Sequence, residues 1–199
     1  MLVAARRGEG VTAAARAVAE AAGPGAAYAL DLDLRRNALA KAYAQVGALG
    51  PRIDGRLNGA QLYDVVDAAG RPVAAGPSYF FHRVGRARLF VGAFDERALP
   101  HGARVRVCGS GAYWNAARAG GATVVVDAPA LERSPLGLRV ARHMDGVVLV
   151  VGADEGAAPA ARAAKAELQG AGANLIGLVY VGASEPVLAI ERALRQAAV

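Results

Sequence analysis

The sequence predicts an α/β fold with a mainly parallel sheet and helices on both faces, arranged as three layers. Short apolar runs alternate with alanine-rich stretches of helical length along most of the 199 residues. Three late runs, VVVD (124–127), VVLVV (147–151) and LIGLVYV (175–181), are apolar at almost every position, as in strands buried on both faces. Right-handed crossovers then bring the carboxyl ends of the strands to one edge, where ligands bind such sheets.

Each element follows from local signals, beginning with LVAA (2–5) and a helix that the GPG at 23–25 stops. The predicted strands are 2–5, 27–32, 79–84, 88–94, 105–108, 122–127, 146–151 and 175–181. The predicted helices are 12–22, 37–46, 113–118, 136–143, 157–169 and 186–197. The middle, 50–102, is predicted to be less regular, with 79–84 and 88–94 as neighbouring strands. We expect residues 1–199 to form one domain.

Composition limits the possible classes of function. The net charge of +6 is carried by arginines that are spread along the chain, and aromatic residues make up only 6%, so no nucleic-acid partner is expected. No apolar run approaches the roughly 18 residues of a membrane span. The one cysteine, Cys108, cannot form an internal disulfide, and the first residues lack a signal-peptide pattern. A cytoplasmic location is therefore expected.

The loop after the first strand reads RRGEGVT, residues 6–12, and leads directly into a helix. Gly8 and Gly10 allow a tight turn whose amides point inward, and the amino end of the helix attracts anions. Thr12 caps the helix or, in a nucleotide site, holds Mg²⁺. A tight strand-to-helix connection that binds no ligand explains the same pattern.

Acidic residues mark two further strand ends. Asp31 and Asp33 are two positions apart, so their side chains face the same side of the strand, and their repulsion is relieved by a cation or a hydrogen-bonding ligand. Asp127 ends a wholly apolar strand, as does an acid that holds Mg²⁺ through water beside phosphates. Local ion pairs or a helix cap are the alternative roles. Together, however, the three strand ends predict a pocket for a nucleotide and a metal ion.

These motifs resemble those of the bacterial tyrosine kinases (BY-kinases) of capsule and exopolysaccharide synthesis, which are relatives of the deviant-Walker ATPases. The resemblance rests, in order, on GEG-x-T (8–12), LDLDLRR (30–36), VVVDAP (124–129), DGVVLVV (145–151) and GANLIGLVYV (172–181). It covers nearly the whole chain. It implies a P-loop NTPase-like fold, binding of ATP with Mg²⁺, and a partner that is an inner-membrane chain-length regulator, or co-polymerase, of polysaccharide export.

The resemblance also implies roles for individual residues. Gly8, Glu9, Gly10 and Thr12 match the Walker A loop, and Asp127 matches Walker B. Asp31, Asp33 and Arg35 match the second acidic motif, in which an acid serves as base for a tyrosine hydroxyl. The expected nucleotide-binding residues are Arg6, Arg7, Gly8, Glu9, Gly10, Val11, Thr12 and Arg35. The expected catalytic residues are Asp31, Asp33 and Asp127, and the expected Mg²⁺ ligands are Thr12, Asp31 and Asp127.

The chain departs from the family pattern at positions that matter for catalysis. Val11 replaces the Walker lysine, Arg7 replaces a proline before GEG, and Asn37 replaces a proline after the double arginine. No tyrosine follows Tyr180, so the C-terminal tyrosine cluster of the kinases is missing. A lysine on the phosphates contributes roughly 1.5–3 kcal/mol, or about 10- to 150-fold in affinity. Binding of ATP and Mg²⁺ is therefore expected to be weak or absent.

The leading hypothesis is a catalytically impaired, BY-kinase-like regulatory protein. It would act at the inner face of the cell membrane through the cytoplasmic segment of a polysaccharide co-polymerase, and the sequence also allows a homodimer. One alternative is an active ATPase or protein-tyrosine kinase in which Arg6 or Arg7 replaces the lysine. Another is a structural interaction module that binds no nucleotide. A dinucleotide-binding fold ranks lower, because the threonine at the helix start and the later VVVDAP suit a P-loop better.

Overall fold

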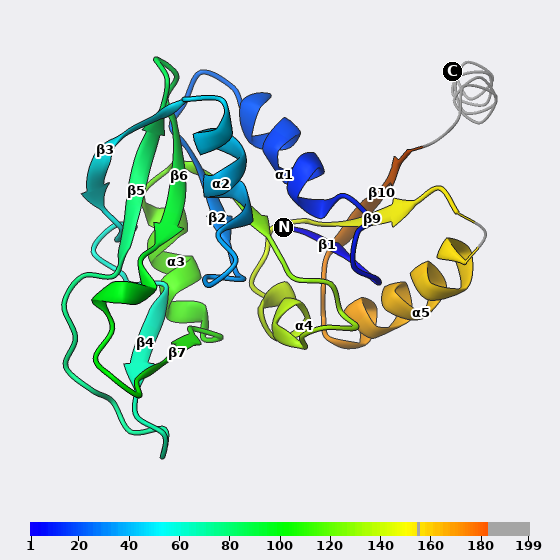
Figure 1. The fold of residues 1–199 in the computed structure, drawn as a ribbon. Coiled ribbons are helices and arrows are strands. Elements are labelled where there is room, and N and C mark those ends of the chain that lie inside the picture. Colours follow the sequence, from blue (N-terminus) through cyan, green and yellow to red (C-terminus); the bar gives the residue numbers. More distant parts are fainter. Residues whose placement is uncertain (155, 183–199) are drawn as a thin grey trace.

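A twisted, mainly parallel sheet forms the centre of the molecule (Figure 1). The structure, a computed structural model, describes residues 1–154 and 156–182. The strands of the main sheet are β1 (Leu2–Ala4), β2 (Ala27–Asp31), β3 (Leu49–Asp54), β5 (Tyr79–Val84), β6 (Leu89–Phe94), β8 (Thr123–Asp127), β9 (Val147–Gly152) and β10 (Leu175–Val181). Their spatial order is β10-β9-β1-β8-β2-β6-β5-β3. Neighbours from β10 to β6 are parallel, whereas β5 runs antiparallel to both β6 and β3.

Helices cover both faces of this sheet, as the sequence predicts. They are α1 (Val11–Glu20), α2 (Ala38–Gln45), α3 (Gly111–Ala119), α4 (Leu136–Ala141) and α5 (Ala157–Gly170). On one face, α1 and α2 pack through Ala15, Leu39 and Tyr43. The opposite face carries α3, α4 and α5, together with a small sheet of β4 (Tyr63–Val66) and β7 (Arg104–Val107). The α/β class with three layers is confirmed.

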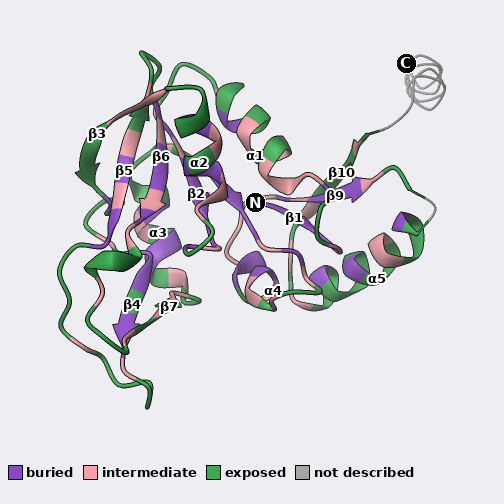
Figure 2. Cartoon of the chain, viewed as in Figure 1, coloured by how far each residue is buried: buried purple, intermediate pink, exposed green. Residues whose placement is uncertain are grey.

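Burial follows the position of each strand in the sheet (Figure 2). The central strands β1, β8 and β9 are mostly buried, which is why their runs are apolar at consecutive positions. The same expectation for β10 is wrong within the described residues. β10 is the last strand in the order, with β9 as its neighbour there, and Ile176 and Tyr180 are 65% and 55% exposed.

The middle of the chain is more regular than the sequence indicates. The expected pair of strands at 79–84 and 88–94 is confirmed as β5 and β6, which are antiparallel. Residues 50–102 also hold β4, most of β3, and a short 3₁₀ helix, Glu96–Ala98, none of which was predicted. The helix expected at 186–197 lies outside the described residues.

The parallel strands bring the motif residues to one edge of the sheet. Asp31 at the end of β2 pairs in register with Asp127 at the end of β8, and Leu2 of β1 also pairs with Asp127. The loops that follow β1, β2 and β8 therefore begin next to one another, at the carboxyl edge where the candidate site lies.

Candidate functional site

The loop between β1 and α1 has the backbone shape that its glycines predict. Gly8 and Gly10 have φ values of 84° and 86°, which residues with a side chain rarely adopt. A Cβ at Gly10 would also lie 2.8 Å from Cγ1 of Val181. The amide of Ala14 donates to the carbonyl of Gly10 (3.0 Å), so the amides of residues 11–13 have no acceptor within the helix. The amino end of α1 is thus a site suited to an anion.

The buried carboxylate of Glu9 stabilises this loop by accepting hydrogen bonds from Arg6. Its side chain is buried, and its carboxylate accepts a hydrogen bond from the backbone amide of Arg6 (3.0 Å) and further bonds from the Arg6 guanidinium (2.9 and 3.1 Å). The same guanidinium donates to Asp154, which follows β9, at 2.6 Å. These hydrogen bonds, to Asp154 first and then Glu9, raise the pKa of Arg6 further above its usual value. Arg6 thus links two loops.

Arg7 is held less firmly and lies at the exposed rim. Its backbone amide donates to Glu132 (2.7 Å), and its guanidinium lies 3.5 Å from the same carboxylate. Val11 follows in the first turn of α1 and packs against the core of the α1–α2 face, so it offers neither charge nor donor. Both arginines of the loop therefore have acidic partners in this structure.

Thr12 and Asp127 form the contact that joins the loop to β8. The Thr12 hydroxyl donates to Oδ2 of Asp127 at 2.7 Å. A hydroxyl and a carboxylate are oxygen ligands of the kind that Mg²⁺ prefers, and in P-loop proteins this pair of residue types holds the ion. The donor set therefore fits Mg²⁺ beside a bound phosphate.

Asp31 has a structural task that the sequence does not reveal. One of its carboxylate oxygens accepts from the amide of Asp33 (2.8 Å), and the other accepts from the amide of Ala38 at the start of α2 (2.6 Å). Asp31 thus shapes the loop between β2 and α2. Asp33 forms an ion pair with Arg133 instead, so the two acids do not share one partner.

The backbone conformation at residue 37 explains why asparagine stands there in place of the proline of the BY-kinase pattern. Its backbone has φ 50°, a value that the ring of proline forbids. Its side-chain amide donates to the carbonyl of Phe94 (2.6 Å) and accepts from the amide of Phe94 (2.8 Å). The loop after the double arginine is therefore fastened to β6 by an amide.

Burial raises the pKa of Asp31 and of Asp127, the two acids that pair in register at the ends of β2 and β8. The pKa of Asp31 is raised to about 6, mainly by desolvation, although the amides that it accepts lower it. The pKa of Asp127 is raised to about 7 by desolvation and then by the charge of Asp31, while the Thr12 hydroxyl and Arg36 act in the opposite direction. Near neutral pH the pair therefore favours a proton or a cation between the strands.

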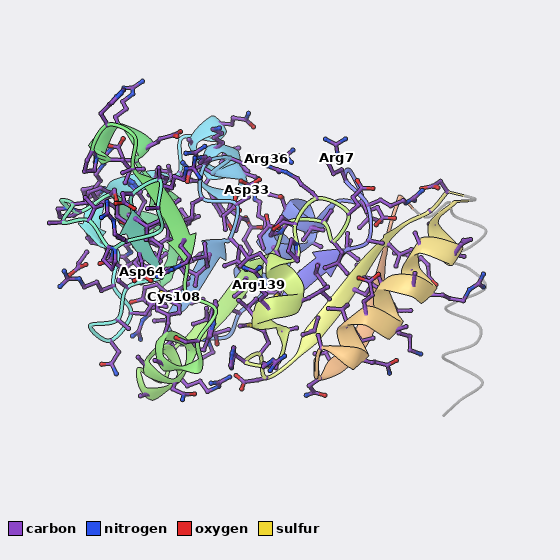
Figure 3. The ribbon with its side chains drawn as sticks, turned by 90° about the horizontal axis from the view of Figure 1, so that it is seen from below. Arg7, Asp33, Arg36, Asp64, Cys108 and Arg139 are labelled. Atoms are coloured by element: carbon purple, nitrogen blue, oxygen red, sulfur yellow. The ribbon has the colours of Figure 1, made fainter. Side chains whose placement is uncertain are left out.

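A cavity of about 320 Å³ joins these parts. Of the expected residues, it is lined by Arg6, Arg7, Gly8, Glu9, Gly10, Val11, Thr12, Asp31, Asp33 and Asp127. Arg35 is absent from the lining and instead pairs with Glu96 (Nε–Oε1 3.1 Å). Arg36, which lies near Asp33 in Figure 3, takes the place on the cavity wall that was expected of Arg35.

Two cations of the cavity were missed by reasoning from the sequence. Arg36 and Arg133 both line it, Arg36 from the loop after β2 and Arg133 from the loop after β8. Arg36 carried a signal, because it is the second arginine of DLDLRR. Arg133 carried none, since its place beside Asp33 depends on how the chain turns after Asp127.

The described residues contain neither a metal-binding cluster of acidic, histidine or cysteine side chains nor a membrane-spanning helix. Within 1–154 and 156–182, no three His, Cys, Asp or Glu side chains gather as a metal-binding group. Thr12 and Asp127 are the residues that would hold Mg²⁺ beside the phosphates of a nucleotide. In the same part of the chain, none of the helices has both the length and the apolar character needed to cross a membrane.

The fold and the arrangement at this edge define an α/β protein with a P-loop kinase-like fold. Among solved structures, the chain is similar to the kinase domain of the Escherichia coli tyrosine kinase ETK, with a TM-score of 0.51. The sequences are 15% identical over 92% of this chain and 69% of that chain. The likeness confirms the expected BY-kinase-like fold. The sequence matches no protein-family model, and no curated protein matches it.

Proposed function

We propose that this chain is a kinase-like regulatory protein of surface-polysaccharide synthesis whose phosphoryl-transfer activity is impaired. In this proposal it binds magnesium-bound nucleotide weakly in the cavity at the carboxyl edge. It works at the inner face of the cell membrane, on the cytoplasmic segment of a polysaccharide co-polymerase. The motif resemblance supplies the polysaccharide and membrane parts of the proposal, and the likeness to a tyrosine kinase domain supports the kinase-like part.

One observation carries the impaired activity. The loop, the Thr12–Asp127 contact and the first amides of α1 have the arrangement of a phosphate site, while Val11 stands where the loop of such a site carries its lysine. Arg6 is engaged by Glu9 and Asp154, whereas Arg7 lies at the exposed rim beside Glu132. A cationic group on the transferring phosphoryl contributes on the order of 10³–10⁵ in rate, so its loss affects catalysis more than binding.

Calorimetric titration with MgATP and MgADP, paired with a transfer assay, tests this function. The assay measures labelled phosphate transferred from ATP to a tyrosine-containing copolymer. We expect weak nucleotide binding that Thr12→Ala lowers further, and a transfer rate no higher than that of Asp127→Ala. Transfer by the unaltered chain that disappears in Asp127→Ala would contradict impairment. Absence of binding at millimolar nucleotide would contradict a nucleotide site and would favour the alternative of a structural interaction module that binds no nucleotide.

An active kinase or ATPase is the second candidate, and the cavity offers a specific reason to test it. Arg36 lines the cavity and forms no ion pair within the described residues, so it is better placed than the engaged Arg6 to meet a phosphate. Arg133 lines the cavity as well, although it is paired with Asp33. If turnover is found, this candidate predicts that Arg36→Ala or Arg133→Ala abolishes it. Arg16→Ala is the matched control, because Arg16 pairs with Glu20, lies over the ring of Tyr43 and does not line the cavity.

A further inference from the structure

A second cavity, which we call the arginine groove, opens next to the candidate site. Its volume is about 530 Å³, and arginines from three elements line it: Arg35 after β2, Arg104 and Arg106 on β7, and Arg139 on α4. Arg104 and Arg106 are two positions apart on one strand, so both side chains leave the same face of β7. Figure 3 shows Arg139 on α4, with Asp33 and Arg36 beyond it.

The charge of the groove is only partly balanced. Arg35 pairs with Glu96 and Arg106 pairs with Asp64, each at 3.1 Å and with more than half of its side chain exposed. Within the described part of the chain, Arg104 and Arg139 form no ion pair. Exposed pairs contribute at most about 1 kcal/mol, so Glu96 and Asp64 are readily exchanged for another carboxylate. The groove is therefore a region of net positive potential.

The remaining surface of the groove suits an extended chain. Apolar residues, including Leu34, Val105 and Val107, line the groove beside the arginines, and the two valines leave the face of β7 opposite to Arg104 and Arg106. The amide of Cys108 donates to the carbonyl of Leu62 in the antiparallel pair of β4 and β7. Along β7, every second residue from Cys108 therefore directs its backbone N–H and C=O groups toward β4. The backbone groups of Val105 and Val107 then point to the other side of β7, where the small sheet has no further strand within the described residues. Such an edge accepts an added strand.

The groove also communicates with the candidate site. Asp33 lines both cavities, and its partner Arg133 precedes Ser134, which lines the groove. A chain lying along β7 toward Asp33 would thus bring one of its residues to the entrance of the nucleotide cavity.

We propose that the arginine groove binds an extended, acidic segment of a protein partner. Carboxylates of the segment meet Arg104 and Arg139, and alternate apolar side chains rest on the valines of β7. No aromatic residue is among the described residues that line the groove, so their surface lacks the stacking platforms of single-stranded nucleic-acid sites. Its concave shape and its half-buried apolar residues do not suit a flat membrane surface. The proposal deepens the regulatory function above, because it names the chemistry of the partner.

Fluorescence anisotropy tests it with a labelled peptide in which glutamate alternates with valine. The titration contains no nucleotide and is made at 0.15 M salt, where charges act over about 8 Å. We expect the glutamate peptide to bind and the matching lysine peptide not to bind. Arg104→Glu and Arg139→Glu should each weaken binding about tenfold or more, because each places like charges together. Arg162→Glu on α5, an exposed position outside the groove, makes the same charge change and should have little effect.

Three results overturn the proposal. They are equal binding of both peptides, equal weakening by Arg162→Glu and Arg104→Glu, and tighter binding of single-stranded DNA or of anionic phospholipid vesicles than of the peptide. Thermal melts of all variants verify folding. The outcome is separable from that of the proposed function, since nucleotide titration reports on Thr12 and Asp127 alone. Peptide binding without nucleotide binding would support the groove and contradict the nucleotide site. Nucleotide binding without peptide binding would support the nucleotide site and contradict the groove.

Discussion

Val11 is the residue on which the chemistry of the site depends most. It occupies the first turn of α1, beside amides that have no helical acceptor, and its side chain packs into the α1–α2 face of the core. The sequence alone identifies this departure, because the loop around it is contiguous. The contacts of Arg6 with Asp154 and of Arg7 with Glu132 could not be predicted from the sequence, because these acids lie in loops more than 100 positions away.

Replacing Val11 by lysine should restore the missing charge. We expect Val11→Lys to raise the affinity for MgADP by about 10- to 150-fold, the effect of one charge-assisted hydrogen bond of roughly 1.5–3 kcal/mol. Val11→Met, which has similar reach and no charge, is the matched control and should leave the affinity unchanged. Calorimetry measures both, and an equal gain in the two variants would show that packing of α1, not charge, limits binding.

Asp127 should make stability depend on pH in a direction unusual for an acid. Its pKa is about 7 in the folded chain, so the folded state retains a proton that the unfolded state releases near pH 4. The free energy of unfolding should therefore fall as pH rises from about 4 to about 7, by on the order of 3 kcal/mol. Asp31 contributes in the same direction, while Arg36 opposes the shift.

Asp127→Asn removes this titration and keeps an oxygen that can accept from Thr12. Urea unfolding at pH 5.5 and pH 8, without magnesium, should show a smaller loss of stability in the variant than in the unaltered chain. A pH dependence of equal size in both proteins would mean that Asp127 is ionised in the folded state throughout this range.

Among the elements, the amino end of α2 shows most clearly what local patterns omit. The helix was expected from its composition, and it begins after Asn37, whose left-handed backbone and two bonds to Phe94 fasten it to β6. The residues near Asn37 do not predict its hydrogen bond to Phe94, which lies 57 positions later in the chain. The unpredicted β3 has a related cause, because its glycine and proline at 50 and 51 suggest a turn, yet an edge strand tolerates both.

Substitutions at Asn37 should separate the bonds from the backbone shape. Asn37→Gly loses the two hydrogen bonds and keeps an easy positive φ, so we expect a loss of about 1–2 kcal/mol in unfolding free energy. Asn37→Ala should lose roughly 1 kcal/mol more, because alanine resists the left-handed region. Equal stability of the two variants in urea melts would indicate that the loop changes shape when the amide is removed.

For the whole molecule, the order of strands was only partly accessible from the sequence. Fully apolar runs correctly predicted buried parallel strands at β8 and β9, since burial on both faces leaves a local trace. They failed for β10, because the position of a strand within the sheet leaves no such trace. The same limit applies to the arginine groove, whose arginines are dispersed in sequence and gathered only by the fold.

The place of β1 in the middle of the sheet has a consequence for how the protein is made. Leu2 pairs with Asp127 on one side and with Val148 on the other, so β1 is synthesised well before both of the strands that flank it. At about 5–20 residues per second, the wait is roughly 7–30 s, during which an apolar strand has no permanent neighbour. A truncated chain, residues 1–121, should accordingly show no cooperative melt by circular dichroism. During synthesis, the same segment is where chaperones have the longest opportunity to act.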